Sequence, residues 1–389
     1  MNQGQYVFSQ LTAFLSHNDF IRCVKKYKGN YKVKTLTCWH QFLHMLFGQL
    51  SRRESLSDLI ICLQSQRNKS YHLGMGKGVS RAALAKANEN RDYRIYESFA
   101  TGLMLQAQQL SVEIEELTLS VNAPVYAIDA TVIDLCLSIF WWGKFRKHKA
   151  AAKVHTVLDV KTNIPTFINI TSGAIHEINV LDILSFDAGS YYTMDKGFID
   201  FGRLYFIHQC NAFYVIRAKD NFKFIRLRSS PVNKNAGIIC DQVIRLKNQK
   251  VSMAYPEYLR RIKYYDEEQQ IEFVFITNDF EIDALEIAHI YKYRWTIELF
   301  FKWIKQHLKI KTFWGHSLNA VRTQVYIAII AYLLVAIVKH TLKLKQTQYE
   351  ILQVLSISLL CKTPLAELFE NDYPQYVKEQ HDKQLNLFE

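Results

Sequence analysis

The chain has 389 residues, an apolar content of 49% and a formal net charge of +12 at pH 7. This apolar content excludes a disordered chain, and the length allows two or three domains with a large buried core. The positive charge clusters beside aromatic residues and predicts an anionic partner, either nucleic acid or an acidic membrane surface. Seven scattered cysteines without a CxxC motif predict reduced thiols in a cytoplasmic protein.

Residues 1–105 have helical spacing and predict a helical N-terminal domain with a role in DNA binding. A loop with three glycines leads there into a short basic helix, which Ser80 is predicted to cap and Arg81 to begin. A basic helix after such a turn suits a helix-turn-helix, so Arg81 is a candidate DNA contact. An ordinary solvated helix fits the same residues equally well.

From Val125 the pattern changes to β-branched and apolar runs. Residues 125–142 predict two strands with a tight connection, and strands and helices then alternate as far as residue 218. This order predicts an α/β domain with a mixed sheet. A basic loop next to Trp142 contains three candidate contacts to the DNA backbone, although a solvated loop is the alternative. These candidates are Arg146, Lys147 and Lys149.

Residues 219–281 form a series of short apolar runs and turns and predict a β-rich insertion. Residues 282–340 return to helical spacing and are assigned with 120–218 to one catalytic domain, which leaves 341–389 as a C-terminal helical tail. The apolar run from Val325 to Val338 has 14 residues. It is too short to span a membrane and predicts a buried core helix, so no membrane partner is expected.

The stretch from Tyr291 to Lys305 contains no Gly or Pro and predicts one buried helix. Tyr291, Arg294, Glu298 and Lys305 fall within an arc of roughly 60° on that helix, with Lys302 close by. A single carboxylate would therefore lie among cations on a narrow polar stripe. The alternative is a solvated helix face with one internal salt bridge.

Two further carboxylates end apolar strands: Asp129 closes VYAID and Asp195 closes SYYTMD. Three carboxylates on one sheet edge would repel each other, and a divalent cation is the usual remedy. Oxygen ligands favour Mg²⁺ or Mn²⁺, and two such ions can activate water and stabilise the leaving oxygen of a phosphodiester. Taken singly, each acid could instead be a helix cap or a surface salt bridge.

These residues carry a resemblance to bacterial insertion-sequence transposases of the DDE type, in the group with a Y-x2-R-x3-E-x6-K signature (insertion-sequence family four). Tyr291, Arg294, Glu298 and Lys305 match that spacing. Asp129 is similar to the first acidic motif of the family. Asp195 followed by Lys196 is similar to the second, where the family often has Arg and Tyr after the Asp. The resemblance covers residues 125–334.

The resemblance implies a ribonuclease-H-like mixed sheet with flanking helices and a β-rich insertion before the last catalytic helix. It implies that Asp129, Asp195 and Glu298 bind two Mg²⁺ ions. It also implies that the signature residues hold DNA phosphates, with Lys302 and Lys196 as further DNA-binding candidates. Trp295 or Trp142 could stack on a flipped base, but core packing fits either one.

The function implied is cleavage at the ends of an insertion sequence and joining of those ends to target DNA. The partners implied are double-stranded DNA, as terminal inverted repeats and as target, and a second copy of the chain in a synaptic homodimer. Two alternatives stay open: a metal-dependent nuclease of the same fold that does not join ends, and a non-catalytic DNA-binding protein derived from a transposase.

Overall fold

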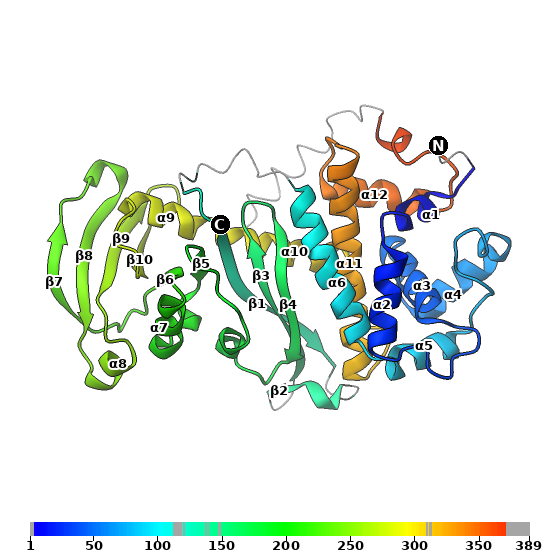
Figure 1. Cartoon of the computed structure of the whole chain (residues 1–389), viewed down its shortest axis with the longest axis horizontal. Coiled ribbons are helices and arrows are strands. Elements are labelled where there is room, and N and C mark those ends of the chain that lie inside the picture. The colour runs from blue at the N-terminus through cyan, green and yellow to red at the C-terminus, as the bar shows by residue number, and fades with distance from the viewer. Residues whose placement is uncertain are drawn as a thin grey trace.

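The computed structural model describes residues 4–370 apart from 112–118, 120, 137, 139, 147–148, 309 and 311–312. A bundle of helices forms one end of the molecule, and a single sheet extends from its middle to the other end (Figure 1). The predicted C-terminal tail lies partly outside these residues, since 371–389 are not described.

The N-terminal part of the chain is helical, as its spacing predicts. Hydroxyl side chains cap four of its helices, and Ser80 accepts a hydrogen bond from the backbone of Ala83 at the predicted position. The helices are α1 Val7–Thr12, α2 His17–Lys26, α3 Cys38–Leu50, α4 Leu56–Ser65, α5 Arg81–Asn90 and α6 Arg94–Leu110.

Ten strands form one sheet in the order β2-β3-β1-β5-β6-β10-β9-β8-β7, with β4 paired to β3. Among the strand pairs that the structure describes, only β1–β5 and β5–β6 are parallel. The strands are β1 Val125–Leu135, β2 Lys144–Arg146, β3 Lys149–Asp159, β4 Ile164–Ser172, β5 Tyr191–Met194, β6 Phe213–Arg217, β7 Phe224–Ser230, β8 Ile238–Leu246, β9 Leu259–Asp266 and β10 Ile271–Thr277.

The predicted insertion continues the central sheet, because β10 pairs antiparallel with β6 and β9, β8 and β7 follow outward. Three antiparallel strands followed by two parallel ones, with helices on the faces, give the predicted ribonuclease-H-like arrangement. The predicted fold class is confirmed: a large mixed sheet with flanking helices, and a helical N-terminal region.

The two sheet faces belong to different core clusters. Along β1, Val125, Ala127 and Ile133 join the larger cluster with the C-terminal helices, whereas Ile128 joins a smaller cluster beneath α7. The remaining helices are α7 Phe201–Gln209, α8 Gln249–Ala254, α9 Ala284–Lys292, α10 Trp295–His307, α11 Leu318–Thr341 and α12 Gln348–Ser358.

Helix α11 is apolar on all sides, and a buried helix is the expected consequence. It has 24 residues, so it extends well beyond the 14-residue apolar run and is long and apolar enough to cross a membrane. In this structure, however, 94% of its most apolar window is buried in the protein. It packs against α3, α5 and α6 of the N-terminal part and also against α10 and α12.

Two predicted elements differ in the structure. Residues 125–142 do not form two strands: β1 is one strand ending at Leu135, and a short 3₁₀ turn follows at Trp141–Gly143. The predicted helix 291–305 is two helices, since α9 ends at Lys292 and α10 begins at Trp295. From Arg294 onward the backbone tightens to i to i−3 hydrogen bonds, which Arg294, Thr296 and Ile297 donate. The predicted single polar stripe therefore does not run through unbroken.

Candidate active site

Two parallel strands bring two of the predicted carboxylates to the same place. Strands β1 and β5 pair in register as far as Ile128 opposite Met194, and Asp129 and Asp195 are the next residues on each chain segment. Neighbouring strands lie about 4.8 Å apart. Side chains alternate between the two faces along a strand, so both residues lie on the same face of the sheet as Tyr191. Helices α9 and α10 cover that face.

The junction between α9 and α10 places a cation against the first of these carboxylates. The guanidinium of Arg294 lies 3.4 Å from Oδ2 of Asp129 and 2.7 Å from Oε1 of Glu298. Its side chain is only 12% exposed, whereas those of Asp129 and Glu298 are 20% and 34% exposed. Residues 165 positions apart in the chain thus meet at one cation.

Charge around Asp129 is not fully balanced. Burial is the main reason that the pKa of Asp129 rises to about 6, and the nearby carboxylates of Glu298 and Glu177 add to the rise. The backbone N–H of Ala130 and the guanidinium of Arg294 act in the opposite direction. The buried Nε of Arg294 donates to no partner among the described residues. Both groups could therefore gain from a further ligand.

Tyr291 is another signature residue that lies near these acids. Its ring packs on Phe275, with centroids 4.7 Å apart, and the Arg294 guanidinium lies 5.6 Å from its centroid. Burial raises the pKa of the Tyr291 hydroxyl, and the charge of Asp195 raises it further. Tyr291, Arg294 and Asp195 therefore belong to one neighbourhood at the end of β5.

The donor set suits a divalent cation, because carboxylate oxygens are the ligands that Mg²⁺ and Mn²⁺ prefer. Arg294 already holds positive charge between two of the carboxylates. In the part of the chain that the structure describes, no three His, Cys, Asp or Glu side chains are grouped closely enough to hold one ion. Metal binding by all three acids would therefore bring their carboxylates closer together than they lie here, beside the guanidinium of Arg294.

The other predicted contacts lie at different distances from the acids. Lys305 is two turns beyond Glu298 on α10, about 10 Å along the axis, and is half-buried, while Lys302 is exposed. Lys196 follows Asp195 directly and its amine lies 3.9 Å from Asp220. Trp295, the first residue of α10, has 58% of its surface exposed.

The remaining candidates are apart from this group. Arg81 is an exposed residue at the start of α5 in the helical bundle. The indole N–H of Trp142 donates to the carbonyl of His316, and its ring packs on Phe140, which favours packing over base stacking. Lys147 and the side chains of Arg146 and Lys149 lie outside what the structure describes.

Two charged residues near the site were not predicted. Glu177 affects the pKa of Asp129 and pairs with the buried Lys153 at 3.6 Å. Arg217 ends β6, the strand beside β5, and its charge acts on the hydroxyl of Tyr291. The strand-end pattern that selected Asp129 would also have selected Arg217, because FYVIR is an apolar run that ends in a charge.

Asp129 should reduce the stability of the metal-free protein at alkaline pH. Its folded pKa of about 6 lies above the ordinary 3.8, so the fold favours the protonated form. That stabilisation is complete below pH 4 and is lost as the pH rises through 6. Asp129→Asn should therefore change the free energy of unfolding more favourably at pH 8 than at pH 4, and the difference between the two effects should be roughly 3 kcal/mol. Urea unfolding in EDTA measures this, and a gain that does not change with pH would contradict it.

Comparison with known proteins agrees with this geometry. Residues 122–334 match the transposase DDE domain, and residues 3–76 match a domain of unknown function (DUF4372). The matched DDE region begins just before β1 and ends within α11, so it contains every strand of the sheet and all three candidate carboxylates. A ribonuclease-H-like sheet with acids on adjacent parallel strands, Asp129 within β1 and Asp195 directly after β5, defines the class as a DDE-type enzyme fold.

Three curated relatives carry transposase names. The chain is 32% identical to a putative transposase, y4zB, of Sinorhizobium fredii over 77% of its own length and 82% of the relative's. It is 27% identical to the putative transposase for insertion sequence element IS4SA of Synechocystis, over 67% of its own length and 72% of the relative's. It is 26% identical to the probable transposase for insertion sequence element IS5377 of Geobacillus stearothermophilus, over 54% of its own length and 55% of the relative's. The chain belongs to the DDE transposase family of bacterial insertion sequences.

Proposed function

We propose that this transposase cleaves DNA at the ends of its own insertion sequence and joins the freed 3′-hydroxyls to target DNA. The observation that supports this most directly is the meeting of Asp129 and Glu298 at Arg294, beside Asp195 at the next strand end. Three carboxylates gathered around one arginine suit phosphoryl transfer, in which positioning and charge stabilisation supply most of the catalysis.

In this proposal Asp129, Asp195 and Glu298 bind two Mg²⁺ ions, for which Mn²⁺ can substitute. The bound metal would activate the attacking water or 3′-hydroxyl and stabilise the leaving oxygen. The protein contributes by holding the first two acids on rigid parallel strands and the third on a helix packed over them. This rigidity fixes the spacing of the acids before substrate arrives.

The phosphates of the DNA end are the natural ligand for the cations of the site. Arg294 can release Asp129 and Glu298 and form a two-point contact with a phosphate, which also satisfies its unpaired Nε. Tyr291 and Lys305 would contact neighbouring phosphates. We assign Lys196, Lys302 and Arg81 to the same DNA and leave Trp295, which is exposed on α10, as the candidate for base stacking.

The DNA partners in this proposal are the terminal inverted repeats and the target. Two DNA ends must be held together during cut-and-paste transposition, so the active form is a homodimer in a synaptic complex. Such a reaction takes place in the bacterial cytoplasm, on the nucleoid.

A strand-transfer assay with pre-cleaved, 3′-hydroxyl-ended duplexes of the element's terminal repeats tests this proposal. The protein with Mg²⁺ should convert a supercoiled target plasmid into joined products. Duplexes that are shortened but never joined would identify a nuclease of the same fold. Duplexes that are bound but neither cut nor joined would identify a non-catalytic DNA-binding protein. Either result would refute the proposed joining reaction.

A further inference from the structure

Half of the net charge of the protein comes from one short segment. Residues 219–250 contain eight Lys or Arg and only two Asp, a net charge of +6 in 32 residues, whereas the whole chain carries +12. Strands β7 and β8 occupy half of this segment. They form the end of the sheet that lies farthest from the helical bundle (Figure 1).

The cations of these strands are exposed and have no acidic partners. We use the name outer basic surface for Lys223, Arg226, Arg228, Arg245 and Lys247, all of which are exposed. Among the described residues none of the five forms an ion pair. The two aspartates of the segment pair elsewhere, with Arg260 and Lys196. The outer basic surface is therefore a concentration of charge that the fold itself does not neutralise.

The next two strands of the same sheet are different. On β9, Lys263 pairs with Glu272 of β10 at 2.7 Å, and Lys292 of α9 pairs with Glu268 at 2.7 Å. These two lysines thus have a carboxylate within contact distance, and Arg260 of β9 pairs with Asp241. Solubility alone does not require the change from paired to unpaired cations between β9 and β8, because mixed charges serve solubility equally well.

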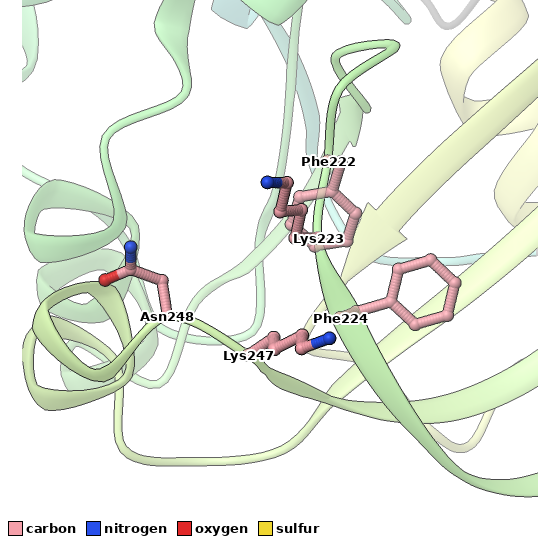
Figure 2. Close-up of a pocket in the computed structure, with 5 residues that line it drawn as sticks. All are labelled: Phe222, Lys223, Phe224, Lys247 and Asn248. Atoms are coloured by element: carbon pink, nitrogen blue, oxygen red, sulfur yellow. The ribbon is translucent and has the colours of Figure 1, made fainter.

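The local structure holds these cations outward. The segments before β7 and after β8 are joined by a backbone hydrogen bond from Lys247 to Lys223, and both lysines line an open pocket with Phe222 and Phe224 (Figure 2). The two phenylalanine rings stack on each other, with centroids 5.7 Å apart. The rings give the pocket an apolar wall, and the lysine amines supply its positive charge.

Strand β7 also has an open edge. Of the described strands, β8 alone pairs with it, and a bulge between Arg226 and Arg228 interrupts that pairing. Charged side chains and a bulge prevent edge-to-edge association with another sheet, so this edge is unsuited to strand addition. Its exposed arginines remain available to an anion, and arginine binds phosphate with two parallel hydrogen bonds.

We propose that the outer basic surface binds the backbone of the DNA duplex that the candidate active site cuts. This inference rests on the proposed function. It adds a second, sequence-independent DNA contact, made by the β-rich insertion, to the contacts at Arg294. The five cations would hold phosphates, and the extended edge of β7, about 24 Å long, would run beside the duplex.

The sheet sets the distance between this surface and the site. Five strand-to-strand steps separate β5, which carries Asp195 at its end, from β7. At about 4.8 Å a step this is about 24 Å, the length of roughly seven base pairs of duplex. A duplex that extends about seven base pairs beyond the acids is therefore long enough to reach the outer basic surface. This geometry favours the cleaved DNA as the ligand over a separate target molecule.

Salt-dependent DNA binding tests the inference without relying on catalysis. We would measure binding of the full-length protein to a 40-base-pair duplex of arbitrary sequence for wild type, Arg226→Gln/Arg228→Gln and Lys223→Gln/Lys247→Gln. Each double variant removes two phosphate contacts. It should weaken binding about tenfold near 0.1 M salt and reduce the slope of log affinity against log salt by about 1.8. The matched control is Lys263→Gln/Lys292→Gln, which removes the same charge from paired lysines and should leave the slope unchanged.

Cleavage and joining then identify the DNA. In single-turnover cleavage of an element-end duplex, the two variants should need more protein for half-maximal rate and reach the wild-type maximal rate. Normal cleavage with impaired joining would assign the surface to target DNA and overturn the proposal. Equal slopes for the variants, the control and wild type would also overturn it, while leaving the proposed reaction intact. Loss of cleavage upon changing the acids is a separate result that concerns the proposed function alone.

Discussion

Asp129→Asn and Glu298→Gln should each reduce Mg²⁺-dependent DNA cleavage by at least about 1,000-fold, which corresponds to a loss of roughly 4 kcal/mol of transition-state stabilisation. Both changes keep side-chain size and remove the charge that would bind metal. Single-turnover cleavage of an element-end duplex measures the effect. Binding of the same duplex without metal should change by less than about threefold, since neither acid contacts phosphate in the proposed complex.

Asp134→Asn is the matched control for this prediction. Asp134 lies on the same strand as Asp129, five residues further along and exposed, where it pairs opposite Ala151. Its replacement should leave cleavage at the wild-type rate. If Asp134→Asn and Asp129→Asn behave alike, or if Asp129→Asn cleaves normally, then the carboxylates at the end of β5 and on β1 are not the catalytic set.

Arg260→Ala should destabilise the protein by about 3–5 kcal/mol. Arg260 on β9 and Asp241 on β8 form a buried two-point ion pair at 3.0 and 2.8 Å. Arg260 also donates to the carbonyl of Ile282 at 2.7 Å, just before α9 begins. The substitution leaves a buried aspartate without its cation and releases the segment that leads into the site.

Two comparisons make this stability prediction specific. The double replacement Arg260→Met/Asp241→Leu removes both charges together, so it should cost much less than Arg260→Ala alone. Lys263→Ala, which breaks an exposed pair on the same strand, should cost less than about 1 kcal/mol. Urea unfolding measures all three. An Arg260→Ala cost as small as that of Lys263→Ala would show that water or a neighbouring group replaces the buried cation.

Much of the candidate site could be predicted because its determinants are local. Asp129 and Asp195 each follow an apolar run, and both come directly after the paired residues of the parallel strands β1 and β5. Asp129 does not end its strand as expected, however, because β1 continues to Leu135. The spacing of Arg294 and Glu298 placed the two side chains on one helix face, and they do contact each other. The spacing of apolar and charged residues was sufficient to predict these positions, because each depends on a single helix or strand.

The break between α9 and α10 could not be predicted in the same way. Tyr293 and Arg294 both have right-handed helical backbone angles, and neither Gly nor Pro marks the junction. Only the tighter backbone hydrogen bonds there show that the helix stops. The break coincides with the contacts of Tyr291 to Phe275 and of Arg294 to Asp129, which are tertiary contacts that no local pattern records.

The pairing of strands that are far apart in the sequence could not be predicted either. The strands of residues 219–281 were recognisable, but their attachment to the central sheet depends on the pairing of β10 with β6, about 60 residues earlier. Backbone hydrogen bonding carries little sequence signal about its partner, so the insertion's place in the sheet follows only from the folded chain. The distance of the outer basic surface from the acids is a consequence of that pairing.

Helix α11 gives the molecule a mechanical property of its own. The helix is shared by two parts of the molecule, since α3, α5 and α6 of the helical bundle pack against it and so does α10. If either the helical bundle or α10, which carries Glu298, separated from α11, apolar surface of α11 would be exposed to water. A load placed on the bundle, such as DNA pulling on its surface, is therefore transmitted through α11 to α10, and melting should be cooperative across both halves.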